Sequence, residues 1–119
     1  MKDIRERTFE FAVRIIKLCH ELDKRPGVSR NVSRQLLNAG TSVGANAEEA
    51  QAAQSKPDFI SKNSIALKEA RETHYWLRLL IAAEIMSEEK LAGLRDEAEE
   101  LKRILGSIVV FARRSQQTL

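Results

Sequence analysis

The stretch LAGLRDEAEELKRILGSIVVFARR, residues 91–114, decides the fold class. Its apolar residues recur at alternating steps of three and four, which places them on one face of an α-helix. The charged residues between them would face water. This spacing predicts a helix that packs in a bundle through a single apolar seam. The seam consists of Leu91, Leu94, Ala98, Leu101, Leu105, Ile108 and Ala112.

Working outward from this stretch, three short breaks divide the chain into four helical segments. Pro26 cannot continue a helix, Pro57 suits a first helical turn, and a third break lies around residues 86–87. We expect helix N-caps at Ser29, Ser55 and Ser87, because a serine hydroxyl accepts from a free backbone N–H. Residues 1–119 are therefore predicted to form one all-α domain, an antiparallel up-down four-helix bundle. The predicted helices are 3–24, 30–54, 56–85 and 88–114.

The first segment carries an unusually wide apolar stripe. Ile4, Phe11, Ile15, Leu18 and Leu22 fall at helical spacings. Four further apolar residues are expected to widen this stripe. They are Phe9, Val13, Ile16 and Cys19.

The second and third segments indicate that the bundle is a subunit of a homo-oligomer. Gly40 and Gly44 lie four apart on one helical face, where another helix can approach closely; a local kink is the alternative. Residues 75–85 are apolar almost all the way round, so more than one side of this helix must be covered. The residues predicted for the subunit interface are Gly40, Gly44, Tyr75, Trp76 and Leu80.

No catalytic, metal-binding or cofactor-binding residues are predicted. A di-metal carboxylate site in a bundle needs two Glu-x-x-His pairs, but Glu72 is one residue too close to His74 and Lys17 precedes His20 by three. The sequence also lacks a glycine-rich phosphate loop and a nucleophile elbow. Cys19 is the only cysteine and lies among apolar residues, which is typical of a buried thiol.

The single cysteine and the lack of a visible targeting or membrane segment favour a cytoplasmic protein. The chain carries 20 basic and 17 acidic residues, a net charge of +3, and the two signs are well mixed. Its longest apolar runs are far shorter than the roughly 20 residues that span a bilayer. The charged N-terminus lacks the apolar core of a signal peptide. We therefore expect no membrane contact.

Two long motifs carry a resemblance to a known family. Residues 34–50, RQLLNAGTSVGANAEEA, and residues 66–77, ALKEARETHYWL, follow each other in the order seen in the 23S rRNA intervening-sequence proteins, also called bacterial four-helix bundle proteins. The resemblance implies an up-down bundle that assembles as a ring, typically a homopentamer. It also implies kinship with the accessory variability determinant of diversity-generating retroelements, which binds nucleic acid and a reverse transcriptase. It identifies no catalytic residue.

Two functions are compatible with these sequence features. The first is a homo-oligomer that binds RNA or DNA through backbone phosphates. Base stacking is not expected, because the chain has few aromatic residues and most look buried. Arg113 and Arg114 would lie at the opposite end of an up-down bundle, which argues against a single basic patch. Two alternatives are that the bundle has two basic ends, or that these cations only stabilise helix C-termini through the helix dipole. The candidate contacts around the turn between the first two helices are Lys17, Lys24, Arg25, Arg30 and Arg34.

The second function is a scaffold that docks a partner protein without nucleic acid. The apolar excess of the third segment supports this function as well as self-association. An enzyme is the third and weakest hypothesis, since no motif in the sequence supports it.

Overall fold

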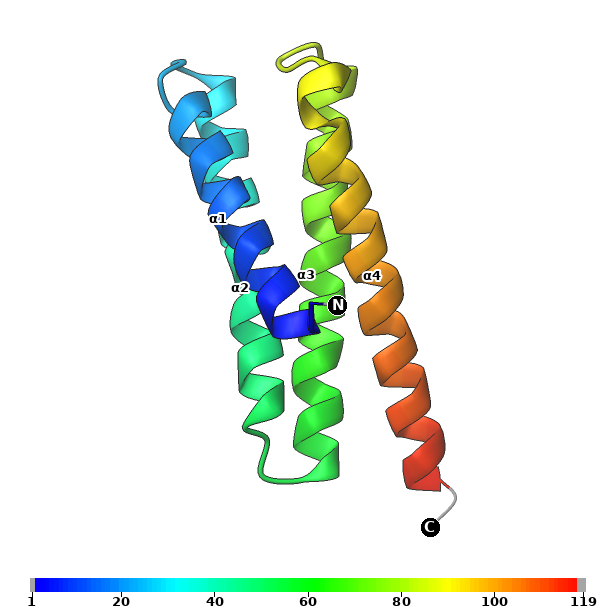
Figure 1. Cartoon of the computed structure of the whole chain (residues 1–119). Coiled ribbons are helices and arrows are strands. Elements are labelled where there is room, and N and C mark those ends of the chain that lie inside the picture. The colour runs from blue at the N-terminus through cyan, green and yellow to red at the C-terminus, as the bar shows by residue number, and fades with distance from the viewer. Residues whose placement is uncertain (1, 118–119) are drawn as a thin grey trace.

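The computed structural model describes residues 2–117 and forms an all-α up-down four-helix bundle (Figure 1), as predicted. Its longest dimension is 53 Å and the other two are 25 and 21 Å. Residues 1, 118 and 119 of the predicted domain lie outside the described part. The helices are α1 (Ile4–Leu22), α2 (Val28–Gln51), α3 (Lys56–Ala82) and α4 (Glu88–Gln117).

Serine hydroxyls begin two of the helices as predicted, and a glycine begins another. The hydroxyl of Ser55 accepts from the N–H of Asp58 at 3.1 Å, and that of Ser87 accepts from the N–H of Lys90 at 3.2 Å. The prediction for Ser29 is wrong, because α2 starts earlier, with Gly27 as its N-cap. Gly27 adopts a φ of +84°, which a residue without a Cβ tolerates.

The end of α3 comes three residues before its predicted boundary. Glu84 adopts a φ of +59°, a conformation that usually selects glycine or asparagine. The N–H of Ile85 then donates to the carbonyl of Leu80, and the N–H of Glu84 donates to that of Ile81, both at 3.0 Å. These two bonds form a Schellman turn, which satisfies carbonyls that the helix leaves free.

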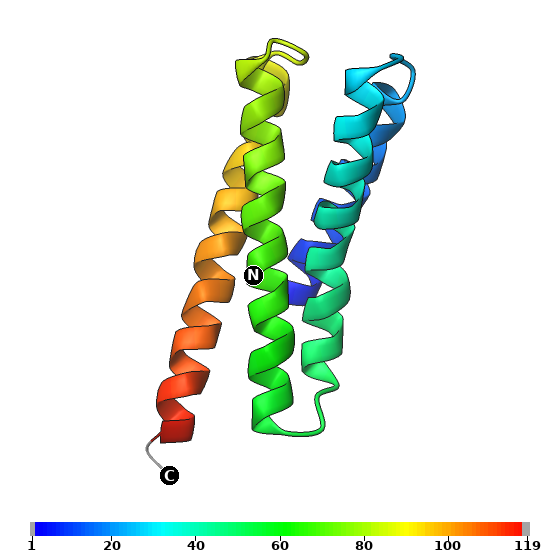
Figure 2. The same ribbon diagram turned by 180° about the vertical axis from the view of Figure 1, so that it is seen from behind.

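The helices differ greatly in length, and this leaves the bundle incompletely covered. α1 has 19 residues and α4 has 30; at 1.5 Å per residue, they are about 28 and 45 Å long. Figures 1 and 2 show that the N-terminal end of α1 lies about halfway along the bundle. The C-terminal part of α4 therefore extends past α1, beside the α2–α3 turn.

Among the described glycines, Gly40 of α2 lies closest to another helix, which is α1. A Cβ added to Gly40 would lie 2.7 Å from Cγ2 of Ile15, and one added to Gly44 would lie 3.1 Å from the carbonyl oxygen of Thr8. Both partners belong to α1 of the same chain. The glycines do admit another helix, as predicted, but their assignment to a subunit interface is corrected: they lie in the chain's own core.

Two ion pairs join α1 to α4. Arg7 binds Glu97 through two hydrogen bonds, of 2.6 and 3.1 Å, and this carboxylate raises the pKa of the arginine. Lys90 also pairs with Glu21 across the seam. Because Arg7 and Glu97 are both about three-quarters buried, their bidentate pair fixes the spacing of α1 and α4 more firmly than an exposed pair would.

Replacing Gly40 with alanine tests the close approach of α1 and α2. Alanine favours a helix by about 1 kcal/mol over glycine, but overpacking a core costs about 1–3 kcal/mol. Ile15 is fully buried and has no room to move, so we expect Gly40→Ala to lower the free energy of unfolding in urea. Gly93→Ala is the matched control and should be neutral or stabilising, since only the flexible tip of Arg14 lies near it. Equal stability of the two variants would contradict the packing argument.

His74 generates a second prediction. Burial lowers the pKa of His74 below its ordinary value of 6.5 and outweighs Glu99, whose carboxylate lies 3.5 Å from Nε2. The unfolded chain therefore binds more protons near that pH, so stability falls as the pH drops from about 7 to about 5. His74→Gln should flatten this part of the pH–stability curve. An unchanged curve in His74→Gln would refute this role.

Candidate interaction surfaces

The five cations predicted to bind nucleic acid are all exposed or partly exposed, but two of them already bind backbone. Arg25 donates to the carbonyl of Ile85 at 2.6 Å, and Arg30 donates to the carbonyl of Asp23 at 3.3 Å. Asp23 is the C-cap of α1, where a cation is favoured by the helix dipole. These two arginines therefore stabilise helix ends and loops, as the alternative interpretation expected.

The predicted cluster is also split between two sides of α1. Arg30 and Arg34 line a hollow beside the end of α1. Lys17 lies on the other flank, because Arg14, three residues before it, and Glu21, four residues after it, both contact α4. The structure thus does not bring the five cations into one patch.

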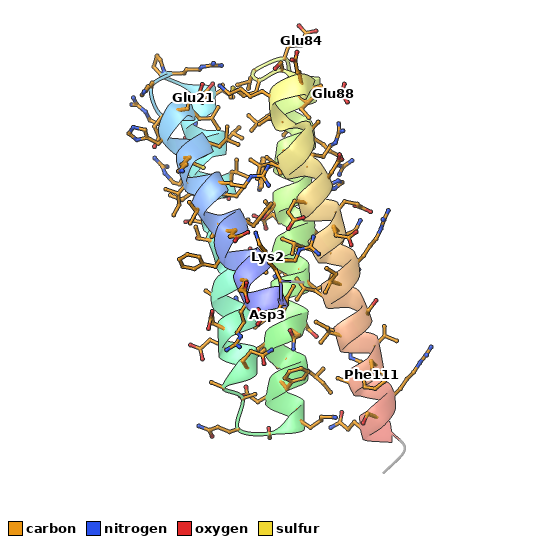
Figure 3. The ribbon with its side chains drawn as sticks, in the orientation of Figure 1. Lys2, Asp3, Glu21, Glu84, Glu88 and Phe111 are labelled. Carbon is orange, nitrogen blue, oxygen red and sulfur yellow. The ribbon has the colours of Figure 1, made fainter. Side chains whose placement is uncertain are left out.

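Carboxylates reduce the positive potential at this end of the bundle. Figure 3 shows Glu21, Glu84 and Glu88 at the same end as the α1–α2 turn. Glu21 pairs with Lys90, and Glu88 pairs with Arg95 at 2.8 Å. Since a mixed charge distribution attracts an anionic partner weakly, this end is a poor candidate for binding phosphates.

The opposite end of the bundle also carries cations that form no ion pair with a described carboxylate. Nζ of Lys56, at the start of α3, donates to Oγ of Ser115 near the end of α4 at 3.3 Å. Lys68 and Arg113 line one hollow between α3 and α4. Within residues 2–117, no ion pair involves any member of this group. We call the group the basic end; it consists of Lys56, Lys68, Arg113 and Arg114.

Sequence reasoning found only half of the basic end. Arg113 and Arg114 were expected at a second pole, but Lys56 and Lys68 were not considered. The up-down order that the periodicity predicts would have placed the start of α3 beside the end of α4. The predicted topology, rather than any local motif, therefore indicated that Lys56 and Lys68 lie near Arg113 and Arg114.

The predicted interface residues on α3 divide between core and surface. Leu80 is 1% exposed and belongs to the core, which corrects its assignment to the interface. Tyr75 is exposed and meets Trp76 edge-on, with ring centres 5.2 Å apart. Trp76 packs partly against the core, and its indole N–H donates to Glu72 at 3.2 Å. Only the Tyr75 side of this helix presents an aromatic surface.

Two other helices carry the most exposed aromatic side chains. Phe9 on α1 is 66% exposed and Phe111 on α4 is 76% exposed. The prediction that Phe9, Val13 and Ile16 widen the apolar stripe is wrong, because they lie on the face of α1 opposite Phe11 and Ile15. The expectation that most aromatic rings are buried is also wrong, since Tyr75 and these two phenylalanines are exposed.

The titratable groups with unusual surroundings do not line the hollows described above. Burial raises the pKa of the Cys19 thiol, which donates to the carbonyl of Ser33 at 3.4 Å. Burial, together with the nearby Glu72, also raises the pKa of Glu69. Among residues 2–117, no three His, Cys, Asp or Glu side chains are placed to hold a metal ion. Nor does any helix in this range combine the length and hydropathy that crossing a bilayer requires.

Comparison with known proteins places the fold in a family. A family model described as 23S rRNA-intervening sequence protein matches residues 2–107. The chain is also similar to the crystal structure of a protein with unknown function from the S23 ribosomal protein family of Bacteroides thetaiotaomicron. The two are 43% identical with a TM-score of 0.83, over 90% of this chain and 98% of that one. No curated protein matches the chain. Because the family model covers most of the bundle, from before α1 into α4, the chain belongs to the 23S rRNA-intervening sequence protein family.

Proposed function

We propose that this chain is a non-enzymatic, self-associating bundle that binds RNA through backbone phosphates. The observation that carries the proposal is the basic end, where four cations lack carboxylate partners in the described structure. When unpaired lysine and arginine side chains bind a phosphate backbone, they displace the counterions condensed on the nucleic acid. The release of these counterions drives association.

The arrangement of these cations suits backbone recognition. Lys68 and Arg113 flank a groove between two antiparallel helices, and Lys56 and Arg114 lie near the same end. Ser61 and Gln116 line the same groove and can hydrogen-bond phosphate or sugar oxygens. The groove offers no exposed aromatic ring of its own, so phosphate contacts rather than base stacking would dominate.

The names of the relatives favour RNA over DNA. The family model is described by an intervening sequence of 23S rRNA, and the Bacteroides protein is assigned to a ribosomal protein family. Each name is a statement about those proteins. For this chain, they make ribosomal RNA the first nucleic acid to test.

A protein-docking scaffold is the second candidate function. The exposed Phe9 and Phe111 favour it, because a soluble monomer rarely exposes large aromatic side chains beside other apolar ones. A partner protein would bind these apolar surfaces, whereas RNA would bind the basic end. The two functions therefore predict different sensitive residues.

The basic end is tested by measuring the affinity for a single-stranded RNA as a function of salt. Each phosphate contact contributes about 0.7 to the slope of log K against log salt. Replacing Lys56, Lys68 and Arg113 together with glutamine should therefore lower the slope by about 2 and weaken binding most at low salt. Arg114 stays unchanged, because it also borders the apolar surface of α4.

The matched control replaces Lys17, Lys24 and Arg34 at the other end, also with glutamine. It removes the same number of charges, so it should leave the slope largely intact if the basic end binds the RNA. Larger losses in the control than in the test variant would assign binding to the originally predicted cluster. No binding by the wild type at about 50 mM salt would eliminate RNA binding and leave the docking scaffold.

A further inference from the structure

The outward face of α3 carries an aromatic ring among cations. Among the described helices, α3 packs only against α2 and α4, and Figure 2 shows it with one of these on either side. One face of α3 is therefore left to solvent. Four exposed residues on this face form what we call the α3 stripe: Lys68, Arg71, Tyr75 and Arg78.

The spacing of the α3 stripe places its members on one side of the helix. Seven residues make almost two full turns, so Lys68 lies in line with Tyr75, and Arg71 lies in line with Arg78. Both arginines are thus on the same flank of the tyrosine. At 1.5 Å per residue, the stripe is about 15 Å long from Lys68 to Arg78. A single strand that follows it would pass all three cations and the ring.

The cations of the α3 stripe are available to bind an anion. Within residues 2–117, none of Lys68, Arg71 and Arg78 forms an ion pair. Lys68 also lines the groove between α3 and α4, so the stripe continues the basic end along α3. By helix register, Glu72 lies on the opposite flank of Tyr75 from the two arginines. A phosphate backbone that follows the arginine flank therefore avoids this carboxylate.

The ring of Tyr75 is held by its neighbours although the residue is 47% exposed. It meets Trp76 edge-on, with the ring planes at 72°, and Trp76 packs partly against the core. The guanidinium carbon of Arg78 lies 5.9 Å from the centre of the tyrosine ring, which is within reach of a cation–π contact. A ring that is already oriented loses little conformational entropy when a flat group stacks on it.

We propose that Tyr75 stacks on a base of single-stranded RNA while Lys68, Arg71 and Arg78 bind the flanking phosphates. This stacking rests on the RNA binding proposed above and specifies the class of RNA. An aromatic side chain can stack on an unpaired base, whereas the bases of a duplex are stacked on one another. Aromatic rings combined with cations that track the backbone are the arrangement that binds single strands.

The cations favour RNA over a partner protein at this surface. The centre of a protein–protein interface is usually depleted of charged residues around its aromatic anchors. On the α3 stripe, Arg71 lies one turn before Tyr75 and Arg78 lies one turn after it. Docking a protein over Tyr75 would therefore bury two guanidiniums without any carboxylate of this chain paired to them.

Replacing Tyr75 with alanine tests the stack. Tyr75→Ala should bind a single-stranded RNA about 5- to 150-fold more weakly, which is the range for the loss of one stacked base. The slope of log K against log salt should stay unchanged, because no phosphate contact is removed. Tyr75→Phe keeps the ring and should bind like the wild type. Inorganic polyphosphate carries charge but no bases, so Tyr75→Ala and the wild type should bind it equally.

Leu79→Ala is the matched control, since Leu79 is 37% exposed on the same helix but lies outside the stripe; it should keep the wild-type affinity for RNA. Equal RNA affinity of Tyr75→Ala and the wild type would overturn the stack. An equal loss for RNA and for polyphosphate would overturn it too. If Tyr75→Ala lowered the assembled mass and left RNA affinity unchanged, Tyr75 would be a protein contact and the stack would be wrong.

The basic end and the stack fail separately. Unchanged RNA binding in Tyr75→Ala, with the expected slope change in the basic-end variant, overturns the stack alone. If the basic-end variant lowered the slope by only about 0.7, the share of Lys68, while Tyr75→Ala lost affinity, the stack would stand and the basic end would be wrong. No binding of RNA or polyphosphate by the wild type at about 50 mM salt would overturn both.

Discussion

The close contact between α1 and the two glycines of α2 is the constraint on which the rest of the structure depends. A Cβ at Gly40 would lie 2.7 Å from Ile15 and one at Gly44 would lie 3.1 Å from the carbonyl oxygen of Thr8, so a larger residue would displace α1 at Gly40 and crowd it at Gly44. This contact sets the rotation of α1 about its axis. Phe11 and Ile15 are thereby directed into the core, and Phe9 and Ile16 are left on the outside. The exposed apolar side of α1 thus follows from a packing contact made on the opposite face of the same helix.

The length of α1 is the second determinant. The first turn of α1 lies about halfway along the bundle (Figure 1). The C-terminal part of α4 therefore has α3 on one side and solvent on the other. That part carries Phe111 on one side and Arg113 on the groove toward α3. The same helix therefore presents an exposed aromatic side chain and a cation on different sides.

Much of the fold followed from the sequence, while its surfaces did not. The seam from Leu91 to Leu105 is buried as its spacing predicted, and Ser55 and Ser87 cap their helices. The end of α3 was missed because Glu84 occupies a position that normally selects glycine. A periodic pattern shows which residues share a helical face, but it does not show which helix covers that face. For this reason the pattern alone places Gly40, Gly44 and Leu80 at a subunit interface and counts Phe9 with the buried stripe of α1.

We propose that the bundle is a subunit of a larger assembly, because Phe9 on α1 and Phe111 on α4 are both largely exposed. Light scattering of the unaltered chain at micromolar concentration tests this claim most directly, because it requires no variant and no ligand. We predict a particle mass several times the protomer mass of 13.5 kDa. A particle of 13.5 kDa under these conditions would contradict the claim.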